Sequence, residues 1–177
     1  QMVRDIMRIA DQVNKRDART IVRTAFNLAG SEARKAVVSA NADIITGEKW
    51  ISTLDGRTSA VCMGRDGKVY DVGVAPFPPA HMNCRSLRVP VVDPKYAIPG
   101  VKGLRSSRNP DGTVEQINGE TTYNSWLKHQ PAEFQDEVLG VERAKLFRGG
   151  MNVDKFTDDE GRTLTLEQLK QLENITL

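Results

Sequence analysis

Apolar residues recur at helical spacing along the first forty residues of the chain. They form two runs, Val3, Ile6, Met7, Ala10 and Val13, and then Val22, Phe26, Ala29, Ala33, Val37 and Ala40. Spacings of three and four residues place each run on one face of a helix, and Asn14, which lies between them, is a good N-cap. The pattern predicts two helices within residues 1–45. The small side chains of the second suit close packing on another helix, of this chain or of a neighbouring subunit.

Residues 46–93 change to short alternating segments. β-branched and aromatic residues predict strands over 48–53, 68–72 and 86–92. Asp66-Gly67 predicts a tight turn before the second strand. A short helix is predicted over 57–62, which Asp55, Thr58 or Ser59 can cap. We expect a small antiparallel β unit here.

Residues 94–119 combine several prolines and glycines with the basic side chains of Lys95, Lys102, Arg105 and Arg108. An irregular stretch of this length is typical of a functional loop or of a disordered linker. If it is functional, Lys102, Arg105 and Arg108 are candidates to contact nucleic acid or an acidic partner.

Residues 120–177 return to helical patterns with breaks. Helices are expected to begin near Thr122, Pro131, Val141 and Thr165, the last with the capping-box spacing of Thr165 and Gln168. The fold class predicted for the whole chain is therefore α+β, with long N-terminal helices, a small antiparallel β unit and short C-terminal helices.

Length and charge restrict the function only loosely. The 177 residues suit one domain or one core with an appended arm, and the net charge of +2 does not by itself imply a nucleic-acid partner. Basic residues gather in 1–40 and acidic residues in 154–173. This uneven charge suits an assembly component, although solvated helix faces are the plainer explanation. The chain contains no run of about 18 apolar residues, so the sequence predicts no membrane span. Because the chain begins with Gln1 and not Met, we expect it to be part of a longer protein.

Both cysteines and one of the two histidines lie close together in sequence, at Cys62, His81 and Cys84. Two thiolates and an imidazole are donors that suit zinc, and the His-x-x-Cys spacing lets two of them converge. Asp55 is the best local candidate for a fourth ligand, and water is the next. Four protein ligands would indicate a structural site, and three with a water a catalytic one.

A metal-free arrangement explains the same residues. Cys62 and Cys84 can be ordinary buried thiols, with His81 bonded to Asp55. Arg57 and Arg85 can complete a structural polar network with Asp55 or Asp66. The residues alone do not decide between these two interpretations.

Enzyme signatures are poorly represented. The chain lacks a phosphate-binding Gly-rich loop and a nucleophile-elbow motif. It also lacks the His-x-Glu and Cys-x-x-Cys pairing of zinc deaminases. A Cys–His nucleophile pair at His81 is the least favoured alternative. We expect no catalytic residues, and a zinc-dependent hydrolase or nuclease is kept as an alternative.

Seven sequence blocks, between about Trp50 and Leu172, have a recognisable order. The first three are Asp55-x-Arg57-Thr58-Ser59-x2-Cys62, Asp66-Gly67-Lys68 and Pro78-Pro79-x-His81-x-Asn83-Cys84-Arg85. The others are Tyr123-x2-Trp126-Leu127-x2-Gln130-Pro131-x2-Phe134-Gln135, Leu139-Gly140, Arg143-x3-Phe147 and Leu164-Thr165-Leu166-x2-Leu169. In this order they resemble the phage Mu F-like head morphogenesis family, the minor head proteins of tailed phages.

The resemblance implies a structural virion protein that is assembled in the host cytoplasm. Such a protein would lie near the portal, contact the portal or major capsid protein, and act in head morphogenesis, DNA packaging or DNA delivery. Contact with packaged DNA is an alternative main role. Ser86 stands where many relatives are expected to carry a further Cys, which excludes a four-ligand site that uses that Cys.

Overall fold

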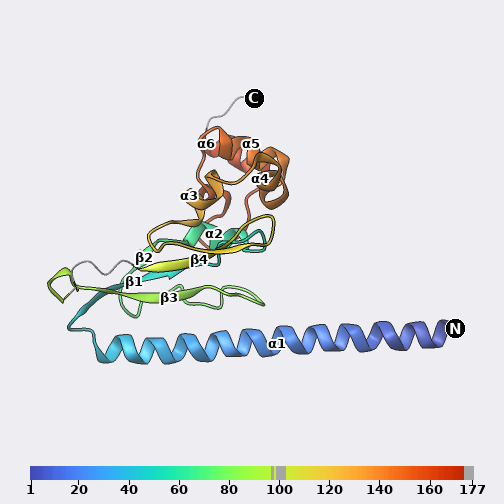
Figure 1. Cartoon of the computed structure of the whole chain (residues 1–177), viewed down its shortest axis with the longest axis horizontal. Coiled ribbons are helices and arrows are strands. Elements are labelled where there is room, and N and C mark those ends of the chain that lie inside the picture. The colour runs from blue at the N-terminus through green and yellow to red at the C-terminus, as the bar shows by residue number, and fades with distance from the viewer. Residues whose placement is uncertain (97, 99–102, 174–177) are drawn as a thin grey trace.

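One continuous helix, α1 (Met2–Ala40), lies beneath the rest of the chain and extends beyond it at its N-terminal end (Figure 1). The computed structural model describes residues 1–96, 98 and 103–173. The two helices predicted for this region are one, and Asn14 lies inside it. Asparagine costs a helix interior well under 1 kcal/mol, and the Lys15–Asp11 ion pair spans its position at 2.5 Å. The local sequence therefore imposes no break at Asn14.

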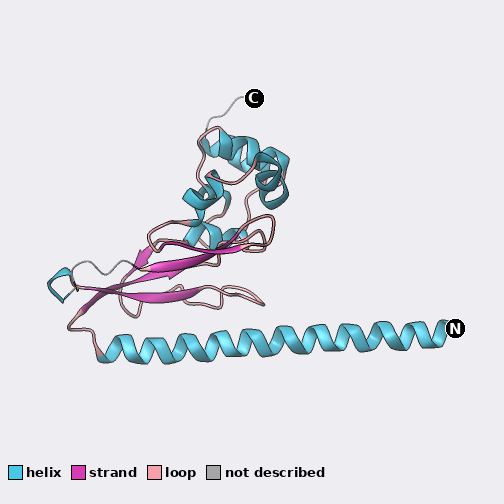
Figure 2. Cartoon of the chain, viewed as in Figure 1, coloured by secondary structure: helices cyan, strands magenta, loops and turns pink. Residues whose placement is uncertain are grey.

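A three-stranded antiparallel sheet lies above α1 (Figure 2), and the order of its strands is β2-β1-β3. Its strands are β1 (Ile45–Ile51), β2 (Val69–Tyr70) and β3 (Leu87–Val92). Gly67, at φ +83°, makes the predicted turn before β2. Pro90 is tolerated within β3 because β3 is an edge strand. The short helix α2 (Ala60–Arg65) begins after Ser59, three residues later than predicted.

The stretch predicted as a long loop contains a hairpin. A 3₁₀ turn over Pro94–Tyr96 is followed by β4 (Leu104–Arg108) and β5 (Val114–Asn118), which pair in antiparallel register. The backbone N–H of Arg108 donates to the Leu54 carbonyl at 2.8 Å, so the hairpin is joined to the main body. The expectation of an irregular loop over 94–119 is corrected: the short strands lack a strong apolar alternation, and tertiary bonds stabilise them.

The C-terminal region is a cluster of short helices above the sheet (Figure 1). They are α3 (Tyr123–Lys128), α4 (Ala132–Leu139), α5 (Val141–Arg148), a 3₁₀ turn (Val153–Phe156) and α6 (Leu166–Glu173). The predicted caps are present: Thr122 accepts a bond from the Ser125 N–H, and Thr165 and Gln168 exchange bonds at 3.2 and 2.8 Å. The α+β fold class predicted from the sequence is confirmed.

Two hydrophobic clusters hold these layers together. The larger joins the C-terminal helices to the middle of the chain through side chains such as Trp126, Phe147 and Leu54. The smaller consists of Trp50, Cys62 and Cys84, so both cysteines are core residues. Of the described helices, none is both long and apolar enough to cross a membrane.

Candidate metal centre

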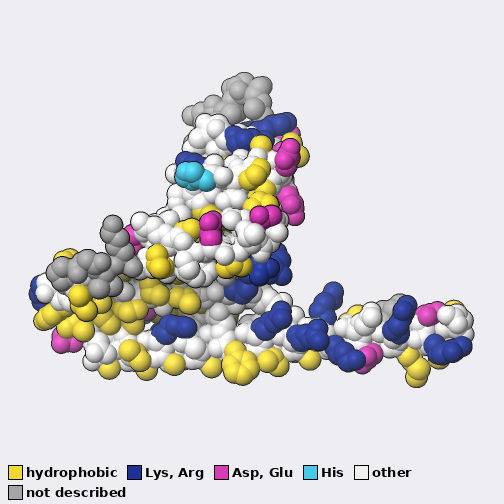
Figure 3. Space-filling view, viewed as in Figure 1, with side chains coloured by type: hydrophobic (Ala, Val, Ile, Leu, Met, Phe, Trp, Pro, Cys, Tyr) yellow, Lys and Arg dark blue, Asp and Glu magenta, His cyan; other side chains and the backbone are white. Residues whose placement is uncertain are grey.

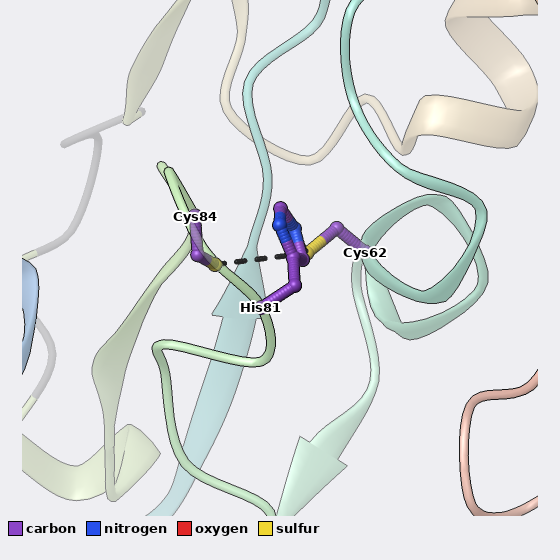
Figure 4. Close-up of side chains that lie close together, drawn as sticks. All are labelled: Cys62, His81 and Cys84. Atoms are coloured by element: carbon purple, nitrogen blue, oxygen red, sulfur yellow. Dashed lines mark hydrogen bonds between the residues drawn. The ribbon is translucent and has the colours of Figure 1, made fainter. Parts of the chain in front are cut away.

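Cys62, His81 and Cys84 converge on one point between α2 and the turn that precedes β3 (Figure 4). The Cys62 Sγ lies 3.3 Å from His81 Nε2 and 3.8 Å from Cys84 Sγ. All three donor atoms lie within 4.8 Å of one another. The structure therefore brings together the three metal-ligand types predicted from the sequence, and this group can hold a metal ion.

The turn over residues 81–84 is held from below by polar side chains of α1. The Asn27 side chain donates to the carbonyls of Cys84 and Ser86 at 2.9 and 3.0 Å. Thr24 accepts a bond from the Asn83 N–H at 3.0 Å, and Asn83 adopts φ +58°, which asparagine tolerates well. Sequence reasoning missed these α1 residues. The available signal was a polar stripe at helical spacing, opposite the apolar one.

The sulfur atoms lie in a dry environment. Cys62 and Cys84 are 1% and 3% exposed, and they pack beside the fully buried Trp50. Ser52 fixes the surrounding backbone, because its hydroxyl accepts from the Trp50 indole N–H at 3.0 Å and donates to the Cys62 carbonyl at 2.8 Å. Burial of this kind strengthens the interaction of a thiolate with a cation.

The hydrogen bonds of the group favour a thiolate at Cys84 and fix the tautomer of His81. Donation from the Cys62 thiol lowers the pKa of Cys84, against the effect of burial, while the shared bond and burial raise the pKa of Cys62. His81 Nδ1 lies 2.8 Å from the Met82 carbonyl, to which it can only donate. This bond leaves the lone pair on Nε2, the nitrogen that lies beside the sulfur and 2.8 Å from the Ser59 hydroxyl.

Asp55 is not part of the group, which corrects its assignment as the fourth ligand. Its carboxylate forms a bidentate pair with Arg85 at 2.6 and 2.8 Å and accepts from the Arg57 N–H at 3.0 Å and the Thr58 hydroxyl at 3.2 Å. Burial opposes ionisation, but the bonds from Arg85, Arg57 and Thr58 lower the pKa of Asp55. The polar network that was the alternative to a metal is thus present beside the cysteines, and His81 does not bond to Asp55.

We expect the Asp55–Arg85 pair to give a pH-dependent contribution to stability. Replacing Arg85 with glutamine should cost about 1–2 kcal/mol at neutral pH, because its side chain, 38% exposed, remains partly solvated. Since the folded-state pKa of Asp55 is lowered, this contribution is complete above about pH 5 and is lost as the pH falls through that pKa. Urea unfolding between about pH 7 and pH 2 measures the difference. A gap between the two proteins that stays constant at acid pH would contradict this interpretation.

The described basic residues of 94–119 do not form one surface. Arg105 is 9% exposed and pairs with Asp66 at 3.0 Å, which corrects its assignment as a surface contact for nucleic acid. The reason is that alternate residues of β4 face inward, where the carboxylate of Asp66 binds the guanidinium. Arg108 is exposed at the end of β4. Lys102 lies outside the described residues.

Comparisons of the chain with protein-family models, with curated proteins and with solved structures found no match. The resemblance to the Mu F-like family therefore rests on the order and spacing of the sequence blocks, and the chemistry of the site rests on its geometry.

Proposed function

We propose that this chain is a structural, non-enzymatic minor head protein of a tailed phage, which binds a portal or major capsid protein through the outer face of α1. The observation that carries the proposal is the length and exposure of this helix. Its 39 residues correspond to about 58 Å at 1.5 Å per residue. Its polar inner side is bonded to the turn that carries the Cys/His group, so the opposite side is available to a partner.

Apolar side chains line that outer side. Val22, Phe26 and Val37 are 51%, 76% and 60% exposed, and the alanines between them, at positions 29, 33 and 36, are exposed as well. Hydrophobic side chains are visible along the lower edge of α1 in Figure 3. A continuous apolar stripe of this kind marks an interaction site more often than a solvated surface. The apolar stripe predicted from the sequence thus faces away from its own chain and fits a helix of another subunit.

The N-terminal half of α1 adds a second argument for an assembly role. The described side chains of residues 1–19 are exposed, apart from the half-buried Asp5, over a length of about 28 Å. A helix that packs against nothing else is only marginally stable in water. A partner subunit along this segment would supply the missing packing.

A non-enzymatic role agrees with the surroundings of the Cys/His group. The two carboxylates nearest in sequence to Cys62, Asp66 and Asp55, are paired with Arg105 and Arg85, so neither is free to accept a proton from a water. The sequence blocks of the Mu F-like family add the context of a phage head, with a location in the virion near the portal.

Charge substitutions on the outer face test the proposal. The Val22→Glu/Val37→Glu variant should co-assemble with the cognate portal and capsid proteins at least about tenfold less well, since charges would be buried against an apolar partner surface. Val141→Glu is the matched control, because Val141 is 52% exposed on α5, away from α1. Copurification from co-expressing cells gives the measurement. Equal recovery of both variants, each with wild-type circular dichroism, would contradict docking through α1.

A second candidate function is direct contact with packaged DNA. A groove of about 320 Å³ on the N-terminal half of α1 is lined by Lys15, Arg16, Arg19 and Arg23. This groove, with the exposed Arg108, replaces the buried Arg105 as the favoured site for phosphates. Binding of duplex DNA that weakens steeply with salt, with no affinity for head proteins, would favour this function over the first.

A further inference from the structure

We infer that Cys62, His81 and Cys84 bind one Zn²⁺ and leave its fourth coordination position open to a groove beside α1, where it takes a small anion or a carboxylate. The inference concerns the metal and its exchangeable ligand, and it does not depend on the proposed role in the phage head.

Two of the three separations between donor atoms are close to those of a tetrahedral zinc site. With Zn–S of about 2.3 Å and Zn–N of about 2.0–2.1 Å, two sulfurs lie about 3.8 Å apart and a sulfur and a nitrogen about 3.6 Å apart. The observed values are 3.8 Å for the two Sγ atoms and 3.3 Å from Cys62 Sγ to His81 Nε2. The third pair, Cys84 Sγ and His81 Nε2, lies within 4.8 Å, so side-chain rotations that move these atoms by about 1 Å complete three corners of the tetrahedron.

The groups behind the donors are arranged for metal binding. The Met82 carbonyl accepts from His81 Nδ1, which fixes the tautomer that presents Nε2 to the ion. Such a second bond from the ligating imidazole is a regular feature of protein zinc sites. Asn27 holds the carbonyl of Cys84 from α1, so the turn that carries two of the ligands is rigid.

The fourth position has room for an exchangeable ligand. Among the described residues, no fourth Cys, His or carboxylate joins the group. A cavity of about 20 Å³ beside it is lined by Cys62, His81 and Ser59, which is space for one water. A larger groove of about 930 Å³, which both His81 and Cys84 also line, lies next to this cavity. A ligand can therefore reach the ion from solvent.

The charges around the groove favour an anion. Zinc with two thiolates is neutral, and the larger groove is lined by the guanidinium groups of Arg23, Arg57 and Arg85, with no carboxylate among its lining residues. Asp55 pairs closely with Arg85, at 2.6 Å, and only loosely with Arg57, at 3.8 Å. Because the Arg57 side chain is 78% exposed, it is the cation best able to pair with an incoming anion. Ser59, 2.8 Å from Nε2, can donate to the same ligand.

Cobalt titration of the purified full chain tests the metal site. Under anaerobic conditions Co²⁺ should bind at one per chain and give sulfur-to-cobalt charge-transfer absorption with the intense visible bands of tetrahedral Co²⁺, and Zn²⁺ should displace it. The His81→Cys variant should still bind cobalt, with a spectrum of three thiolates. His81→Ala should weaken binding by at least about tenfold, whereas His129→Ala, at the exposed second histidine, should leave it unchanged.

Azide and acetate then test the open position on the cobalt-loaded chain. Each should shift the visible bands in a saturable manner, and Arg57→Gln should raise the apparent Kd for azide about two- to fivefold, as expected for an exposed cation. Failure of the wild-type chain, folded by circular dichroism, to bind cobalt would overturn the metal site. Stoichiometric cobalt whose spectrum does not respond to either anion would overturn the open position.

Discussion

Replacing Asp66 with alanine is expected to cost about 4 kcal/mol or more of unfolding free energy. The Asp66 side chain is fully buried and accepts four bonds: from the N–H groups of Ser52 and Tyr123, both at 2.6 Å, and from Arg105 at 3.0 and 3.1 Å. Its removal leaves a buried guanidinium unpaired, which costs about 3–5 kcal/mol, and two buried N–H groups without acceptors, each about 1–3 kcal/mol. The expected total is lower than the sum of these costs, because the unpaired Arg105 and the two N–H groups can partly relax towards solvent.

For a chain of this size, the loss corresponds to a fall in Tm of roughly 8–16 °C. Asp11→Ala is the matched control, because Asp11 makes an exposed ion pair on α1 and should shift stability by less than about 1 kcal/mol. Thermal and urea unfolding of both variants measure the difference. Similar stabilities for the two variants would show that Asp66 does not join β1, β4 and α3 in the way described.

Replacing Arg88 with alanine should have an effect of similar size, about 3–5 kcal/mol, because it leaves Glu48 buried without its partner. The two side chains are each 2% exposed and lie 3.3 Å apart across β1 and β3. Arg88 also donates to the carbonyls of Val74 and Pro76 at 2.6 and 3.2 Å and lies 4.7 Å from the ring centre of Phe77. One side chain therefore holds both the sheet and the segment that leads to His81.

A double variant separates the cost of the unpaired Glu48 charge from the cost of the lost Arg88 volume. Arg88→Met combined with Glu48→Gln removes both charges but keeps most of the volume, and it should recover at least about 1 kcal/mol relative to Arg88→Ala. Arg162→Ala, which breaks an exposed ion pair, should leave the stability nearly unchanged. If Arg88→Ala were as mild as Arg162→Ala, the buried pair would not be a main support of the sheet.

Local signals in the sequence were sufficient for the C-terminal helices and for the three strands of the β2-β1-β3 sheet. Thr122 and Thr165 are N-caps. The turn at Gly67 has a positive φ, which only glycine adopts easily. The hairpin of β4 and β5 was missed because its stability comes from distant partners. Arg105 reaches Asp66 across 39 positions of sequence, and no local pattern encodes that bond.

In the candidate site, too, local sequence identified some residues and long-range contacts decided the others. Residue chemistry identified Cys62, His81 and Cys84, and the structure places them together. The sequence left Asp55 open between a metal ligand and a partner of Arg85, because residue type alone does not show whether a carboxylate binds a metal or an arginine. The α1 residues that hold the turn, such as Asn27, were missed because they lie 57 positions from their partner.

Photo-crosslinking in assembled heads tests the central claim, that α1 docks on another head protein, most directly. If the chain is the minor head protein proposed above, a benzoylphenylalanine placed at Val22 or Val37 should form a crosslink to the portal or major capsid protein in assembled heads. The same probe at Val141, which is similarly exposed on α5, should form none. Crosslinks from Val141 alone, or crosslinks from Val22 and Val37 to DNA alone, would contradict the account.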